Sequence, residues 1–209
     1  TDAWFARNGL SLPLLLEPPP WVPATASDLP RIQVIDQGST LIATYGSGYD
    51  ASILLVFGPN GHVLGAFDFT AWLTPQQVAP GEAGFVHGGV RWAWVEEGIL
   101  YVTTSHRTYA ASSMGKNAFL SAIDLDSGRL RWQSDPLVCN AQDFVVIADS
   151  LVCGYGFTAE PDALYILDRA TGAVQAKTKL KTGPDYFVVK GEELFVRTYD
   201  TDYVFSIGR

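Results

Sequence analysis

The sequence predicts an all-β fold built from repeated units of four short antiparallel strands. Short apolar runs rich in β-branched and aromatic side chains alternate with turn signals along the chain. The clearest unit covers residues 144–182, where turn signals separate four such runs. Only one short helix is expected, at residues 74–78, because Thr74 can cap it and Pro75 fits its first turn. With 47% hydrophobic residues in 209, the chain can bury a sizeable core.

Each unit begins with a hairpin whose second strand starts at a leucine. The hairpins cover residues 32–47, 92–107, 144–157 and 186–200, and their equivalent leucines are Leu41, Leu100, Leu151 and Leu194. Successive leucines are 59, 51 and 43 residues apart. Four-stranded repeats of about 40–50 residues are typical of propeller blades, so the sequence predicts a small β-propeller.

The second half of a unit is another hairpin, which turns on a glycine. These hairpins cover residues 52–69, 119–135 and 163–179, and their turns lie at Gly61, Gly128 and Gly172. Glycine suits such a turn because it adopts a positive φ without steric cost. An aspartate four residues before the glycine, Asp124 or Asp168, is expected to cap the turn through its side chain.

The fourth unit lacks a last strand, and the N-terminal region offers a replacement. Residues 8–17 read like the glycine turn and outer strand of the other units, and Pro13 suits an edge strand because it has no N–H to donate. We therefore expect a single domain, residues 1–209, that forms a four-bladed ring closed by this N-terminal strand. The predicted blades cover residues 31–69, 89–135, 142–181, and 184–209 together with 8–17.

The charge of the chain excludes one class of partner. A net charge of −8 and a pI near 4.7 argue against nucleic-acid binding, which needs a basic face. No apolar run is long enough for a transmembrane helix. The sequence starts at Thr1 without a methionine, which indicates a removed signal peptide or a piece of a longer chain. We therefore expect an extracellular or periplasmic protein.

Residues 122–132 resemble the repeat of pyrroloquinoline-quinone-type β-propellers. That repeat has the form A-x-D-x-x-[ST]-G-x-x-x-W, and this segment reads AIDLDSGRLRW. Residues 166–174 repeat the motif without the tryptophan. The resemblance implies a propeller in which Trp132 packs between blades. Quinone dehydrogenases of this family are much longer, whereas smaller relatives are scaffolds, including the propeller lipoprotein of the outer-membrane assembly machinery. The resemblance thus implies a small non-enzymatic member, and no cofactor or metal is expected.

Two histidines provide the alternative to a binding role. His87 precedes the inner strand of the second unit and His106 ends its second strand, so both lie at the same end of the hairpin. With a nearby carboxylate they could serve a small propeller enzyme, a hydrolase or a lyase. They could equally be two separate loop histidines, since two imidazoles without a third ligand are a weak metal signal.

Two cysteines lie 14 residues apart, at Cys139 and Cys153. No histidine lies near them, so a four-ligand metal site is not expected. A disulfide and two separate buried thiols are both compatible with the sequence.

The candidate ligand-binding face consists of the loops between the second and third strands of each unit. These loops are rich in tyrosine, which offers rigid contact area and a polar tip. The candidate residues are Tyr45, Tyr49, His87, His106, Tyr109, Tyr155, Phe157, Tyr199, Asp200 and Tyr203.

The same aromatic rings could instead only seal the channel and the seams between blades. If they bind, the acidic residues of these loops favour a cationic or hydroxyl-rich partner. The sequence therefore predicts a non-catalytic binding or scaffold protein for a protein or glycan partner. A homodimer, in which two copies form an eight-bladed assembly, is a further alternative.

Overall fold

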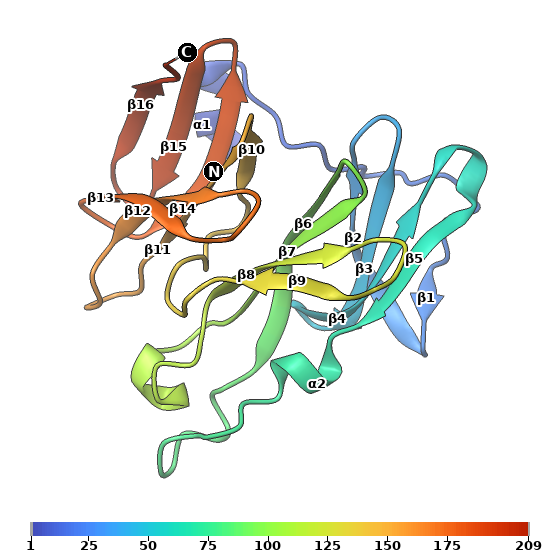
Figure 1. Ribbon diagram of the computed structural model, residues 1–209, viewed down its shortest axis with the longest axis horizontal. Helices are drawn as coiled ribbons and strands as arrows, with labels where there is room; N and C mark the ends of the chain where they lie inside the picture. Colours follow the sequence, from blue (N-terminus) through green and yellow to red (C-terminus); the bar gives the residue numbers. More distant parts are fainter. Residues whose placement is uncertain (1, 209) are drawn as a thin grey trace.

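The computed structural model describes residues 2–208 and has the predicted all-β fold, with short strands throughout and little helix (Figure 1). The first unit contains β2 (Leu29–Asp36), β3 (Leu41–Ser47), β4 (Asp50–Phe57) and β5 (Val63–Asp68), with the short β1 (Thr25–Ala26) beside β2. The second contains β6 (Gly88–Glu96), β7 (Ile99–His106), β8 (Phe119–Asp124) and β9 (Leu130–Gln133). The third contains β10 (Val145–Ile147), β11 (Ser150–Tyr155), β12 (Ala163–Asp168) and β13 (Val174–Lys179). The last contains β14 (Pro184–Lys190), β15 (Glu193–Thr198) and β16 (Asp202–Ser206).

Neighbouring strands within each unit pair in antiparallel order, as expected for consecutive hairpins. The first two units join into one sheet through a single bridge between Ala51 of β4 and Val90 of β6. The third unit is a separate four-stranded sheet, and the last is a three-stranded sheet. The repeated leucines lie on the second strand of each hairpin, β3, β7, β11 or β15, and Leu100 and Leu151 are completely buried.

The glycine turns have the predicted caps. The Asp124 carboxylate accepts hydrogen bonds from the Ser127 backbone N–H (2.9 Å) and hydroxyl (2.7 Å). Asp168 accepts the same pair of bonds from Thr171, at 2.8 and 2.7 Å. Because each carboxylate closes its own turn, neither needs a partner elsewhere in the fold.

Tryptophan rings pack on two of the turn glycines. A Cβ on Gly172 would lie 2.4 Å from the ring of Trp132, so only glycine leaves room for it. The Trp132 Nε1–H donates to Arg169 O (3.1 Å), which fixes the ring across the seam between the second and third units. Trp21 lies in the same way against Gly61, where an added Cβ would be 2.8 Å from the ring.

The predicted pairing of residues 8–17 with the last unit is wrong. Leu14 bridges Ile35 of β2, and the Leu15 N–H donates to Val34 O (3.0 Å). In the described part of the chain, β16 pairs with β15 alone. The segment pairs with the first unit because one edge of β2 is open beyond the short β1, and its free backbone groups accept the apolar run.

The start of the chain forms an unpredicted helix, α1 (Asp2–Asn8), which packs on the last unit. The rings of Phe5 and Tyr186 meet edge to face at 5.3 Å, and Arg7 pairs with Asp202 at 2.8 Å. In Figure 1 the chain then crosses from this unit to the first one. The N-terminal segment is therefore a strap between the first and last units, not a strand of the last.

The helix expected at residues 74–78 forms earlier, as α2 (Thr70–Leu73). The Asp68 carboxylate accepts the Thr70 N–H (2.8 Å) at its start. Thr74 is already extended, as expected for a residue that precedes proline. No helix among the described residues is long and apolar enough to cross a membrane.

Candidate functional site

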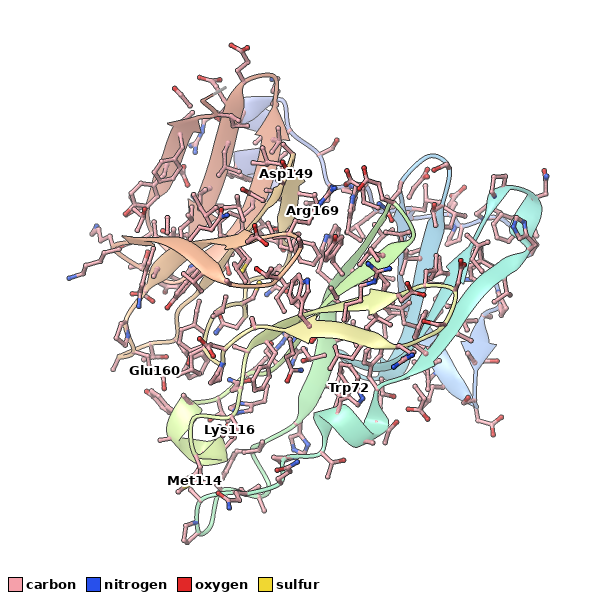
Figure 2. All side chains as sticks on the ribbon, viewed as in Figure 1. Trp72, Met114, Lys116, Asp149, Glu160 and Arg169 are labelled. Carbon is pink, nitrogen blue, oxygen red and sulfur yellow. The ribbon has the colours of Figure 1, made fainter. Side chains whose placement is uncertain are left out.

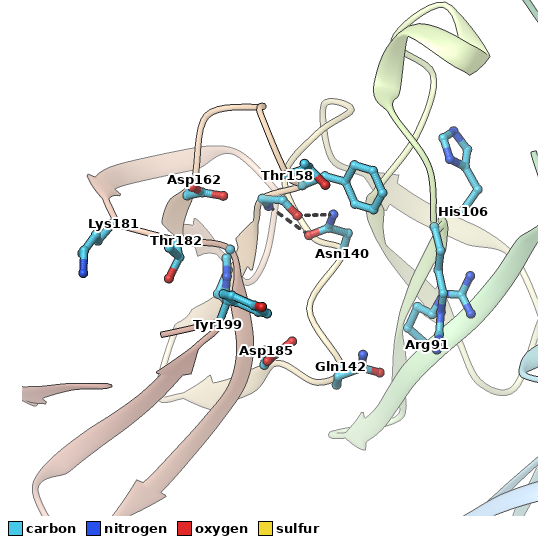
Figure 3. A pocket seen from close by; sticks show the side chains of 15 residues that line it. Arg91, His106, Asn140, Gln142, Thr158, Asp162, Lys181, Thr182, Asp185 and Tyr199 are labelled. Carbon is cyan, nitrogen blue, oxygen red and sulfur yellow. Dashed lines mark hydrogen bonds between the residues drawn. The ribbon is translucent and has the colours of Figure 1, made fainter. Parts of the chain in front are cut away.

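A cavity of about 690 Å³ opens where the second, third and last units meet (Figure 3). Its walls come from β6, from the end of β7, from the segment before β10, and from the loops that follow β11, β13 and β15. The lining residues are Arg91, His106, Arg107, Asn140, Gln142, Gly156, Phe157, Thr158, Asp162, Lys181, Thr182, Gly183, Pro184, Asp185 and Tyr199.

The structure brings part of the predicted face to this cavity. His106, Phe157 and Tyr199 line it. Tyr109 packs edge to face on Phe157, with ring centroids 5.1 Å apart. Tyr155 lies behind this wall, where its hydroxyl is hydrogen-bonded to the Glu160 carboxylate.

Tyr45 lies elsewhere, which corrects its predicted place on the face. Its side chain is 0% exposed, and its hydroxyl donates to Pro23 O (3.1 Å) in the core of the first unit. Both faces of β3 are covered, so the alternation of its residues does not turn this ring toward solvent. Burial raises the pKa of the Tyr45 hydroxyl, which is consistent with a packing residue.

The remaining predicted residues surround the cavity without lining it. Tyr49 is exposed beneath the Arg107 guanidinium, whose carbon lies 5.8 Å from the ring centroid. The exposed Asp200 accepts from the Thr182 hydroxyl (3.0 Å). The Tyr203 hydroxyl accepts the Lys181 N–H (2.9 Å).

The two histidines lie at the same end of their hairpin but do not share a site. Gly88, which follows His87, pairs with His106. The His87 ring donates from Nε2 to Gly84 O (2.7 Å) at the surface. Among the residues that the structure describes, no group of three His, Cys, Asp or Glu side chains could hold a metal ion.

His106 uses both of its ring nitrogens inside the fold. Nδ1 accepts the Thr108 N–H (3.4 Å), so the proton lies on Nε2, which donates to the Ser113 hydroxyl (2.6 Å). Burial and the nearby Arg91 cation lower the pKa of His106. The imidazole is therefore neutral at neutral pH and holds the loop after β7 in place.

Arg91 is the most buried cation of the site. Its side chain is only 3% exposed and pairs with Asp50 at 3.0 Å. It also donates to the Ser105 carbonyl oxygen (2.8 Å) and to Tyr49 O (3.2 Å). Asp50 can come this close because Gly89 has no Cβ, which would lie 3.0 Å from Asp50 Cα.

The carboxyl groups of the site differ in their partners. Glu160 is fully used, because it also accepts the Ala110 N–H (2.7 Å). In contrast, Asp162 has a buried oxygen without a hydrogen-bond partner in the described chain. Burial raises the pKa of Asp162 and of Asp185, which lies at the base of the cavity in Figure 3.

Asn140 fixes the shape of the third unit's wall. Its side-chain amide donates to Gly156 O (2.9 Å), and its side-chain carbonyl accepts the Gly156 N–H (3.1 Å). A Cβ on Gly156 would lie 2.2 Å from Asp162 Oδ1, so glycine is required for the close approach. This double hydrogen bond is drawn as dashed lines in Figure 3.

Cys139 and Cys153 are both buried free thiols whose side chains contact each other. The Cys153 thiol donates weakly to Val138 O (3.5 Å). Burial raises the pKa of Cys139 well above its usual value, so this thiol stays protonated and unreactive while the fold is closed.

Five charged residues of the cavity were not predicted from the sequence, namely Arg91, Arg107, Asp162, Lys181 and Asp185. Only Arg91 carries a local signal, because it interrupts the apolar strand β6. A buried arginine is rare unless it is paired. Arg107, Asp162 and Lys181 lie in connecting segments and Asp185 lies near the start of β14, where charged residues are ordinary for a surface.

The two ends of the third unit differ in character. Figure 2 shows Asp149 and Arg169 together at one end and Glu160 at the other. Arg169 pairs with Glu96 (3.1 Å) and Glu97 (2.6 Å), so its charge is neutralised within the fold. The end near Glu160 faces the cavity, and the end near Arg169 carries the glycine turn.

No protein-family model matches the sequence, and no curated protein matches it in sequence. Among solved structures, the computationally designed Ika4 protein is similar with a TM-score of 0.56 at 11% identity, over 92% of this chain and 100% of that chain. Sqt1 from Saccharomyces cerevisiae has a TM-score of 0.52 at 12% identity, over 82% of this chain and 43% of its own.

A third similar structure is the quinohemoprotein alcohol dehydrogenase ADHIIG from Pseudomonas putida HK5. Its TM-score is 0.50 at 15% identity, over 78% of this chain and 27% of the enzyme. This chain thus spans about a quarter of that enzyme's length. At such identities the likeness shows the fold alone. Together with the repeated antiparallel units, it shows that the chain has an all-β, propeller-like fold.

Proposed function

We propose that this chain is a non-catalytic binding or scaffold protein of the pyrroloquinoline-quinone-like propeller type, which holds a protein or glycan partner at the mouth of the large cavity. The observation that carries the proposal is the convergence of polar side chains from three units on one cavity. Several of these groups, Arg107, Asp162 and Asp185 among them, have no hydrogen-bond or ion-pair partner within the described chain. Such convergence in a concave site is typical of ligand binding.

The chemistry of the site favours binding over catalysis. His106 is the only histidine among the described residues that line the cavity. Both of its ring nitrogens are engaged, so it offers a ligand no free imidazole base. The exposed Tyr199 and the partly covered Phe157 offer aromatic surface at the rim. Aromatic rings beside hydrogen-bonding groups suit a partner that is fixed in place rather than transformed.

The proposal is tested by screening the protein on a glycan array and in a pull-down, and then measuring the affinity of each recovered partner for variants. Tyr199→Ala and Lys181→Ala should each weaken binding by about tenfold, which corresponds to about 1.4 kcal/mol. Lys179→Ala is the matched control, because Lys179 is an exposed lysine on β13 that does not line the cavity. Equal affinity losses in Lys181→Ala and Lys179→Ala would place the partner elsewhere.

We also propose that residues 1–209 form one domain in which the four units are blades of a single ring. On this view the N-terminal strap closes the ring by holding the first and last units together. Trp4, in the strap, is buried, whereas Trp72 of α2 is 43% exposed. Trp4→Ala should therefore lower the free energy of unfolding by about 3 kcal/mol, and Trp72→Ala by about 1 kcal/mol or less. Urea unfolding of both variants measures the difference, and equal losses would reject a closing role for the strap.

A further inference from the structure

An excess of positive charge lies at one wall of the cavity, although the chain as a whole has a net charge of −8. Burial lowers the pKa of Arg91, and the nearby charge of Arg107 lowers it further. One carboxylate, Asp50, pairs with Arg91. Within residues 2–208, Arg107 contacts no carboxylate, and its interaction is with the Tyr49 ring. Two guanidinium groups thus share one counter-charge.

Unpaired hydrogen-bond donors lie beneath these two arginines. A smaller cavity of about 180 Å³ shares Arg91, Arg107 and Gln142 with the large one. It is also lined by Thr44 and Trp92, which are 0% and 3% exposed. The Thr44 hydroxyl and the Trp92 indole N–H have no hydrogen-bond partner in the described structure. Buried polar groups are normally paired, so unpaired ones beside two cations indicate a place for an acceptor.

The acidic loop residues are compatible with an acceptor beside the two arginines, because most of them already have hydrogen-bond or ion-pair partners within the fold. Glu160 accepts from Ala110 and Tyr155, and Asp200 pairs with Lys181 at 3.4 Å. The cationic or hydroxyl-rich partner expected from the acidic loops stays a prediction, and this assignment follows its hydroxyl-rich alternative. The carboxyl groups that remain unpaired, Asp162 and Asp185, lie on the wall opposite Arg91 in Figure 3.

The opposite wall suits hydroxyl groups. Asp162 has a buried oxygen without a partner, and burial raises the pKa of both Asp162 and Asp185. The oxygens of these carboxyl groups can accept hydrogen bonds from hydroxyl groups. Tyr199, which is 81% exposed at the rim, offers a free aromatic face. A sugar ring carries the matching hydroxyls and an apolar face that packs on aromatic rings.

We propose that the ligand of this cavity is an acidic sugar, whose carboxylate binds at Arg107 and Arg91 while its hydroxyls face Asp162 and Asp185. This rests on the proposed binding function and names its ligand class. An acidic peptide would bind the arginines, but it lacks the ring hydroxyls that match the wall of Asp162 and Asp185. The sugar is therefore the better fit.

The test compares D-glucuronate with D-glucose, which differ at one carboxylate. Both are titrated into the isotopically labelled protein, and dissociation constants are taken from backbone and indole chemical shifts. Glucuronate should bind at least about tenfold more tightly than glucose, and added salt should reduce the difference, because the contact is between charges. The indole N–H signal of Trp92, assigned with Trp92→Phe, should move with glucuronate and not with glucose.

Arg107→Gln is the decisive variant, because Arg107 is exposed and its loss should leave the melting temperature unchanged. It should abolish the preference for glucuronate. Arg129→Gln is the matched control, since Arg129 is an exposed arginine beside the distant turn at Gly128 and should retain the preference. Equal affinities for the two sugars, or an unchanged preference in Arg107→Gln, would overturn the proposal.

Two further outcomes separate this inference from the proposed function. Arg107-dependent binding of an acidic tetrapeptide without binding of glucuronate would keep the anion site and reject the sugar. A neutral glycan or protein that binds wild type and Arg107→Gln alike, but not Lys181→Ala, would reject the acidic ligand while the binding function stands.

Discussion

The two rims of the molecule use the same residue types in opposite ways. At the rim of the glycine turns, the carboxylates of Asp124 and Asp168 are closed by the side chains and N–H groups of their own turns. At the rim of the cavity, Asp162 and Asp185 are partly buried but accept no such hydrogen bonds. The pKa of Asp124 is accordingly lowered by Arg131 and Ser127, and that of Asp162 is raised by burial.

This difference in hydrogen bonding indicates which rim is better suited to bind a ligand. Polar groups that are satisfied within the fold gain little from a partner, since they would have to break bonds they already have. Groups that are buried and unpaired gain a full hydrogen bond when a ligand arrives. The carboxylates of the turn rim are therefore paired within the fold, whereas Asp162 at the cavity rim keeps an unpaired oxygen, which is why we propose the ligand site there.

The largest expected effect lies at the turn rim and uses two glycines with the same backbone conformation. Gly172 (φ +74) has Trp132 against it, whereas Gly128 (φ +67) has open space around its Cα. Gly128→Ala should cost about 1 kcal/mol from its positive φ. Gly172→Ala should cost about 3 kcal/mol or more, because the Trp132 ring must also move. Urea unfolding measures both, and equal costs would mean that the tryptophan contact does not hold the seam.

The second prediction concerns Asp143, a fully buried carboxyl behind the cavity wall. Its Oδ1 accepts the Phe187 N–H (2.7 Å), yet burial raises its pKa well above the usual value. Because the folded state then holds a proton that the unfolded state has released, Asp143 lowers stability progressively as pH rises above about 4. Asp143→Asn keeps the acceptor and should make the protein more stable at pH 7, but not below pH 4.

For each unit by which the pKa of Asp143 is raised, Asp143→Asn should increase the free energy of unfolding at pH 7 by about 1.4 kcal/mol. Asp126→Asn is the control, because Asp126 is an exposed aspartate at the turn rim. Thermal unfolding between pH 4 and pH 8 provides the comparison. Destabilisation by Asp143→Asn across that whole range would show that the buried group is ionised and paired.

The smallest effect compares one aspartate from each rim. The hydroxyl and N–H of Thr171 lower the pKa of Asp168, so its contribution to stability is present above the unfolded pKa and lost as pH falls. Burial raises the pKa of Asp162, so its sign is reversed. At pH 7, Asp168→Asn should therefore lower the denaturation midpoint, and Asp162→Asn should leave it unchanged or raise it. If the denaturation midpoint shifted in the same direction in both variants, the proposed difference between the two rims would be wrong.

The sequence by itself determined the features that depend on neighbours along the chain. Alternating apolar runs predicted the strands, and glycines with an aspartate four residues earlier predicted the capped turns at Gly128 and Gly172. These signals are reliable because the side-chain period of a strand and the φ of a turn are properties of a few consecutive residues. The position of Trp132 between units was implied by the resemblance to the pyrroloquinoline-quinone-type repeat, and its contacts with Arg169 and Gly172 agree with it.

Only the tertiary structure decided which long-range partners meet. The strap could have paired with β16 or with β2, since backbone groups at either edge accept an extended chain. Leu14 and Leu15 pair with β2, while Phe5 packs on Tyr186 of the last unit. Tyr45 is buried because both faces of β3 are covered. Arg91 and Arg107 share one wall because β6 and β7 pair, while the residues across from them arrive from the third and last units. The cavity and its charge therefore exist only where three units meet, and no single stretch of sequence contains them.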